Sequence, residues 1–241
     1  MPQNNQNQDK IIQNQVVSQN KGVADILFIL DTSTSMNNVF DFLIKNIDVF
    51  IQKLKIEVKA INQWDLRVGV VAGDRLEYFI LPFNNDVKKI SEGLKRIMEE
   101  RKKANECILM GIDLALTELE WRKEARRILI VFTDEKLSTN HKPEVQRNGL
   151  QEIIKRLTEM KILLIFYSPE CPDYKNLAII PKSKIDFIIS KNDLIERNKL
   201  ENIFDALIKT LGASFYQNFQ VPITARYKTK IYNENYKITN L

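Results

Sequence analysis

Three oxygen-bearing side chains alternate along one short stretch of the chain, at Asp31, Ser33 and Ser35. A carboxylate and two hydroxyls are hard donors, which suit Mg²⁺, Mn²⁺ or Ca²⁺ better than a soft metal. Alternate residues of an extended turn can point the same way, so this spacing can bring all three groups to one point. A simpler interpretation stays open, because Ser and Thr are also good N-caps for a helix that follows a strand.

A second carboxylate, Asp134, stands in a similar position. It follows the apolar run 127–133, just as Asp31 closes the apolar run 24–31. Nearly continuous apolar runs are typical of central parallel strands that are covered on both faces. Ligands of such sheets bind at the carboxyl ends of the strands, so the two aspartates would lie side by side if their strands are neighbours.

Hydrophobic periodicity predicts the elements that must position these residues. The segment Gly73-Asp74-Arg75 separates two short strands and predicts an antiparallel hairpin. Pro82 and the cluster Asn84-Asn85-Asp86 are expected to end the second strand of this hairpin and to cap the next helix, and Gly212 to end the last helix. We expect helices over 39–58, 86–102, 108–119, 143–160 and 193–211, and further strands over 66–72, 76–81, 161–167 and 185–189.

The order of these elements predicts an α/β fold with a mostly parallel central sheet, one antiparallel edge strand, and helices on both faces. Residues 22–212 would form this domain. The Gln/Asn-rich residues 1–21 have almost no aromatic content and are expected to be disordered. In the extension 213–241, residues 224–232 alternate between apolar or hydroxyl and basic side chains, which predicts an edge strand or a hairpin used for docking.

Composition limits the classes of function. The 241 residues include 36 basic and 31 acidic side chains, for a net charge of +5. Acidic residues are interleaved with the basic clusters, Arg101-Lys102-Lys103 included, so we interpret these clusters as solvated surface and not as a nucleic-acid site. The sequence has neither an apolar run long enough to span a bilayer nor a secretory signal. We therefore expect a cytoplasmic protein in which Cys107 and Cys171 are free thiols.

Three motifs together resemble the von Willebrand factor type A (vWA) domain family. They are Asp31-Thr32-Ser33-Thr34-Ser35, Leu66-Arg67-Val68-Gly69-Val70-Val71 and Leu129-Ile130-Val131-Phe132-Thr133-Asp134. The similarity covers about residues 22–212 and implies a Rossmann-like fold with a metal-ion-dependent adhesion site, called MIDAS. In such a site Ser33 and Ser35 would bind the metal directly, and Asp31 and Asp134 directly or through water. A partner's Asp or Glu would fill the open coordination position, an arrangement that suits Mg²⁺.

The chain departs from the family pattern at one ligand. The pattern has a threonine on the loop before the helix at 108–119, and its place falls here on Cys107 or Glu106. Cysteine is a poor ligand for Mg²⁺, whereas Glu106 offers oxygen. The resemblance thus implies Asp31, Ser33, Ser35, Glu106 and Asp134 as the metal ligands. An added carboxylate would raise the affinity for a cation but reduce the positive charge left for an acidic partner.

The predicted function is binding and not catalysis. The chain has no Gly-x-Ser-x-Gly elbow and no phosphate-cradling glycine-rich loop, and we interpret the lone His141 as a surface residue. We predict an intracellular interaction module that acts as a subunit or adaptor of a larger assembly. Two alternatives stay open: a metal-dependent phosphohydrolase or nuclease that uses Asp31, Glu106 and Asp134, and a metal-free structural subunit anchored by residues 213–241.

Overall fold

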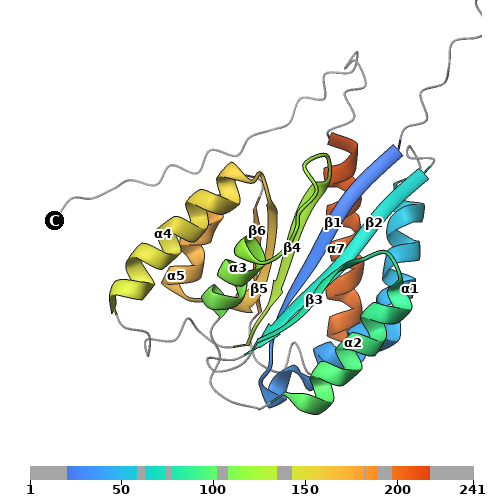
Figure 1. The fold of residues 1–241 in the computed structure, drawn as a ribbon, viewed down its shortest axis with the longest axis horizontal. Coiled ribbons are helices and arrows are strands. Elements are labelled where there is room, and N and C mark those ends of the chain that lie inside the picture. Colours follow the sequence, from blue (N-terminus) through green and yellow to red (C-terminus); the bar gives the residue numbers. More distant parts are fainter. Residues whose placement is uncertain are drawn as a thin grey trace, which may run out of the picture.

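The computed structural model describes residues 21–58, 63–73, 78–101, 108–134, 143–181, 183–188 and 197–217. These residues form a six-stranded sheet with the order β3-β2-β1-β4-β5-β6 (Figure 1). Neighbouring strands are parallel except for β2 and β3, which run antiparallel at one edge. The strands are β1 (Lys21–Asp31), β2 (Gln63–Gly73), β3 (Tyr78–Asn84), β4 (Arg126–Phe132), β5 (Leu163–Pro169) and β6 (Lys184–Ile188).

Helices cover both faces of this sheet, which confirms the predicted fold class. In Figure 1, α1, α2 and α7 lie on one side of the sheet, and α3, α4 and α5 lie on the other. The helical elements are η2 (Thr34–Met36), α1 (Asn37–Glu57), α2 (Val87–Glu100), α3 (Ile108–Thr117), α4 (Pro143–Glu159), α5 (Pro172–Lys175), η3 (Asn176–Ile179) and α7 (Arg197–Gln217).

The central strand β1 supplies side chains to a separate core on each face. Ile26, Phe28 and Leu30 belong to the core beneath α1, α2 and α7. Leu27 and Ile29 point the opposite way, into the core beneath α3 and α4. Successive side chains of a strand alternate between faces, so a strand with helices on both sides must be apolar throughout. This explains the unbroken apolar run that ends at Asp31.

Pro82 does not end the hairpin's second strand, contrary to our prediction, because β3 continues to Asn84. The strand ends instead at the predicted cluster Asn84-Asn85-Asp86, in which the Asp86 side chain caps α2 by accepting from the N–H of Lys88. The pairing of β2 with β3 shifts by one residue between Val68 and Val70, which leaves an irregularity opposite Pro82. Proline has no N–H group to donate, and it is tolerated on edge strands and at bulges. Pro82 occupies both kinds of position, so it costs the sheet little.

Gly212 does not end the last helix, again contrary to prediction, because α7 runs to Gln217. A Cβ atom at Gly212 would lie 2.5 Å from Cγ of Glu57, near the end of α1. The glycine therefore allows α1 and α7 to approach closely and is not a stop signal. Residues 213–217, which we assigned to a C-terminal extension, continue this helix.

Several predictions fall on residues that the structure does not describe. They concern residues 1–20, Glu106, Cys107, His141 and the alternating stretch 224–232. Cys171 is a buried free thiol, as predicted. Among the described residues, no helix combines the length and the apolar character that a membrane span requires.

Candidate metal centre

The candidate centre lies where β1 and β4 end. The two strands are hydrogen-bonded neighbours, and their parallel register pairs Leu30 with Phe132. The residues that follow, Asp31 on one strand and Thr133 and Asp134 on the other, therefore reach the same edge of the sheet. Both aspartates are buried, with relative exposures of 0% and 2%. The expectation that the two aspartate-terminated strands are neighbours is confirmed.

Ser33 makes contacts with all three of the other described candidate ligands. Its backbone N–H donates to Oδ1 of Asp31 at 2.7 Å. Its hydroxyl lies 2.8 Å from the Ser35 hydroxyl and donates to Oδ1 of Asp134 at 3.4 Å. The structure thus gathers Asp31, Ser33, Ser35 and Asp134 into one cluster of oxygen atoms. The spacing indicated this for the first three residues, and the expected pairing of the two strands indicated it for Asp134.

The capping interpretation of this stretch does not hold for Ser33. The residue stands at the N-cap position of η2, but its side chain makes no capping hydrogen bond. Only its carbonyl takes part in the turn, by accepting from the N–H of Met36 at 3.2 Å. The hydroxyl is directed instead at Ser35 and Asp134, so the turn presents it to the cluster.

Thr133 holds the carboxylate of Asp31 in place. Its hydroxyl donates to Oδ2 of Asp31 at 3.0 Å, and both residues are fully buried. With Ser33 bonded to the other oxygen, the Asp31 carboxylate is fixed at both atoms. Sequence analysis gave Thr133 no role of its own. The available signal was its position directly before Asp134, because the β1–β4 register then places it beside Asp31.

Arg101 is a further residue at this centre that sequence analysis misjudged. We interpreted it as part of a solvated basic cluster, but it is only 6% exposed. Its guanidinium donates to the carbonyl of Ser33 at 3.5 Å and to the side chain of Asn37, and it lies 4.5 Å from the Phe40 ring centroid. Burial lowers the pKa of Arg101, while the nearby charges of Asp31 and Asp41 oppose that shift. A guanidinium so buried remains charged, because its ordinary pKa is very high.

The donor chemistry of the cluster fits a hard divalent cation. It consists of two buried carboxylates and two hydroxyls, the oxygen ligands that Mg²⁺ accepts. Within the described ranges, no three His, Cys, Asp or Glu side chains are placed to share a metal. A metal here would therefore depend on the serine hydroxyls. Glu106, the fifth predicted ligand, lies outside the described residues.

Comparison with known proteins agrees with this fold. Residues 26–136 match the family model of the von Willebrand factor type A domain. The matched stretch begins within β1 and ends just after Asp134, so it contains all four clustered residues. No curated protein matches the chain. The match and the mostly parallel sheet are consistent with a vWA Rossmann-like fold. Domains of the vWA family commonly mediate protein–protein interaction.

Proposed function

We propose that this chain is a protein-interaction module that holds a divalent cation, Mg²⁺ or else Mn²⁺ or Ca²⁺, at the edge of its sheet. Asp31, Ser33, Ser35 and Asp134 would hold the ion, with Glu106 as a further oxygen donor. The observation that supports this most directly is the position of the Ser33 hydroxyl, which contacts both Ser35 and Asp134. Oxygen atoms from two separate loops would then lie within reach of one ion.

Electrostatics favours a cation at this point. Two carboxylates buried close together repel each other, and each loses hydration that water would otherwise supply. The hydrogen bonds from Ser33 and Thr133 orient Asp31 but leave its charge in place. When bound, Mg²⁺ supplies positive charge and an open coordination position for a carboxylate. The module would therefore recognise an Asp or Glu side chain of a partner protein.

The proposed role is a non-catalytic subunit or adaptor of a larger assembly. We place it in the cytoplasm, because a buried free thiol such as Cys171 suits a reducing compartment. Ser33 and Thr133 each donate a hydrogen bond to one oxygen of Asp31, which suits this carboxylate to holding an ion in a fixed position. The same set of oxygens could serve a phosphohydrolase, so the test below includes a turnover assay.

The first test is metal binding by the full chain, measured by titration calorimetry with Mg²⁺ and Mn²⁺. Ser33→Ala is expected to weaken binding at least tenfold, since loss of a ligand or of its support typically costs about 10- to 100-fold. The matched control is Ser183→Ala, because that hydroxyl donates to the Ala178 carbonyl and is exposed. Equal affinity in Ser33→Ala and wild type would contradict the proposal, as would no binding at all.

The second test measures whether the bound metal keeps a coordination position that a carboxylate can fill. Mn²⁺ bound to the protein relaxes water protons, and a short Asp-containing peptide should reduce this effect by displacing metal-bound water. The Asn counterpart of that peptide should not. Turnover of bis(p-nitrophenyl) phosphate that requires Mg²⁺ and is lost in Asp31→Ala would instead establish the hydrolase alternative.

A further inference from the structure

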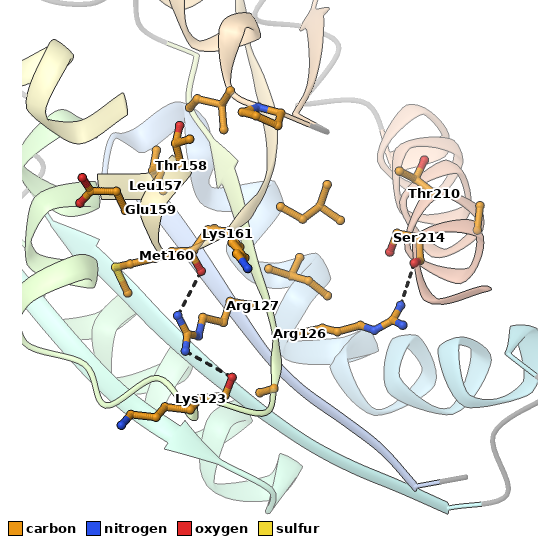
Figure 2. Close-up of a pocket in the computed structure, with 17 residues that line it drawn as sticks. Lys123, Arg126, Arg127, Leu157, Thr158, Glu159, Met160, Lys161, Thr210 and Ser214 are labelled. Atoms are coloured by element: carbon orange, nitrogen blue, oxygen red, sulfur yellow. Dashed lines mark hydrogen bonds between the residues drawn. The ribbon is translucent and has the colours of Figure 1, made fainter. Parts of the chain in front are cut away.

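A second candidate site lies at the opposite end of the strands from the metal cluster, where β4 begins. Strand β4 begins with Arg126 at this end and ends with Phe132 beside the cluster. The pocket here has a volume of about 1020 Å³. Figure 2 shows the residues that form it: the start of β4, the end of α4 with the turn that follows, and the last turns of α7.

The charge of this pocket is mostly positive. Lys123, Arg126, Arg127 and Lys161 line it, and Glu159 is the acidic residue among the lining side chains. The two lysines are exposed, so their ammonium groups can reach a ligand at the mouth. A pocket wall with one dominant sign of charge raises the local concentration of oppositely charged groups. An anionic ligand is therefore favoured.

The two arginines are held in place by backbone carbonyls. Arg126 donates to the carbonyl of Ser214 on α7 at 2.7 Å, and its guanidinium lies 5.1 Å from the Phe215 ring centroid. Arg127 donates to the carbonyls of Arg122 at 3.1 Å and Met160 at 3.0 Å, as Figure 2 shows in part. These carbonyl acceptors orient the two guanidinium groups, so the arginines hold fixed positions in the pocket wall.

Apolar side chains make up much of the remaining lining. They are Ile128, Leu157, Met160, Ile162, Leu163 and Ile180. Most of these are buried, but Met160 and Leu163 are only half-buried. Ile128, Leu157, Ile162 and Ile180 are at most 2% exposed, so Met160 and Leu163 supply the accessible apolar surface. A basic rim beside this small apolar surface matches an acidic peptide that also carries an apolar side chain, because such a peptide can bury area and pair its charges together.

We propose that this pocket binds an acidic, partly apolar segment of a partner protein. The chain's own C-terminal residues are a poor match, since 218–241 contain Arg226, Lys228, Lys230 and Lys237 against the single acid Glu234. Their charge has the same sign as the pocket. The metal cluster and this pocket lie at opposite ends of β4, so the chain can engage two partners at once. The inference does not depend on whether a metal is bound.

Fluorescence anisotropy with the full chain tests this proposal. The probe is a short fluorescein-labelled peptide of Asp, Glu, Leu and Gly, and its counterpart carries Asn and Gln in place of the acids. The acidic peptide is expected to bind, and the amide peptide to bind at least tenfold more weakly. The double variant K123E/K161E should weaken binding of the acidic peptide at least tenfold, because it replaces attraction by repulsion at two exposed positions.

The matched control is K89E/K95E, which changes the net charge equally on exposed positions of α2 that do not line the pocket. All titrations are carried out in EDTA, so that peptide held through a metal does not contribute, and under this condition both this control and Ser33→Ala should leave peptide binding within twofold of wild type. Failure of the metal proposal would thus not affect this result. Three outcomes would overturn the inference: no saturable binding, equal weakening by both double variants, or tighter binding of single-stranded DNA that K123E/K161E abolishes.

Discussion

At the scale of single residues, Arg101 places a fixed positive charge beside the proposed metal ligands. Its guanidinium contacts the Ser33 carbonyl and lies over the Phe40 ring. In the absence of metal this charge offsets the repulsion between the buried carboxylates, and in its presence it repels the ion. We therefore expect Arg101→Met to raise the affinity for Mg²⁺ by about threefold to tenfold. Titration calorimetry on the full chain measures this.

Stability should change in the opposite direction. Without metal, Arg101→Met should lower the free energy of unfolding by about 1–2 kcal/mol, through loss of the cation–π contact and of the compensating charge. Arg96→Met is the control, because Arg96 is an exposed residue of the same helix. If Arg101→Met binds Mg²⁺ more weakly than wild type, the side chain holds the loop in shape and does not compete with the ion.

The residues of the candidate site differ in how far sequence alone identifies them. Four of them follow apolar strands at recognisable spacing, so their types and positions were enough to identify them as candidate ligands: Asp31, Ser33, Ser35 and Asp134. Thr133 and Arg101 act through neighbours that only the fold provides: the β1–β4 register for the first, and the packing of α2 against α1 for the second. A charged residue at the end of an amphipathic helix has no local feature that distinguishes it from solvated surface.

At the scale of elements, Gly69 on β2 determines how closely the edge strand β3 can approach β2. A Cβ at this position would lie 2.9 Å from Cδ1 of Leu27 and 3.1 Å from the backbone carbonyl oxygen of Leu81. The Leu81 carbonyl belongs to β3 and cannot rotate away as a side chain does. Gly69→Ala is expected to lower the free energy of unfolding by about 1–3 kcal/mol, because overpacking must displace β3 or strain β2.

Gly149→Ala is the matched control for this substitution. Gly149 lies within α4, and a Cβ there would meet no atom within 4 Å. Alanine is the better helix former, so this change should raise the free energy of unfolding by up to about 1 kcal/mol. Urea unfolding of both variants gives the two values. Equal and small effects would show that the edge strand yields without cost and that the contact at Gly69 is not tight.

Element types followed from the sequence better than element ends. Strands and helices were predicted from apolar periodicity, which depends only on which face each element buries. The predictions at Pro82 and Gly212 were wrong because proline usually ends a strand and glycine usually ends a helix. In this fold the edge position of β3 makes the missing N–H harmless, and the glycine inside α7 lies against the side chain of Glu57 near the end of α1. Both exceptions depend on neighbours distant in the sequence.

At the scale of the whole molecule, a partly buried ion-pair network joins three separate segments near the starts of β1 and β2. Asp25 on β1 is fully buried, and both its oxygens accept from Arg67 on β2, at 2.9 Å each. Arg122, in the connection before β4, donates to Asp25 through its backbone N–H at 2.9 Å and its Nε at 3.0 Å. A second pair links Arg122 to Asp65 at 2.9 Å.

This network makes the stability of the fold depend on pH. Burial alone would raise the pKa of Asp25, but the hydrogen bonds from Arg67 and Arg122 outweigh it and the pKa lies below its ordinary value. A carboxyl group with a lowered pKa in the folded state contributes stability above its unfolded pKa of about 3.9, and this contribution is lost as the pH falls through the folded value. We therefore expect Asp25 to contribute in full at neutral pH and progressively less below about pH 4.

The substitution Asp25→Asn tests this directly. At neutral pH it should lower the free energy of unfolding by about 3 kcal/mol, since it leaves two arginines in a partly buried site without their shared carboxylate. The difference from wild type should shrink as the pH falls below the unfolded pKa of about 3.9, because the carboxyl of the unfolded wild-type chain then takes up a proton. Urea unfolding followed by tryptophan fluorescence at several pH values measures both effects.

Asp113→Asn is the control, because the Asp113 side chain is 45% exposed in its pair with Arg156 and should contribute less than about 1 kcal/mol at any pH. A difference between wild type and Asp25→Asn that stays constant down to low pH would mean that the carboxylate acts through packing and not through its charge.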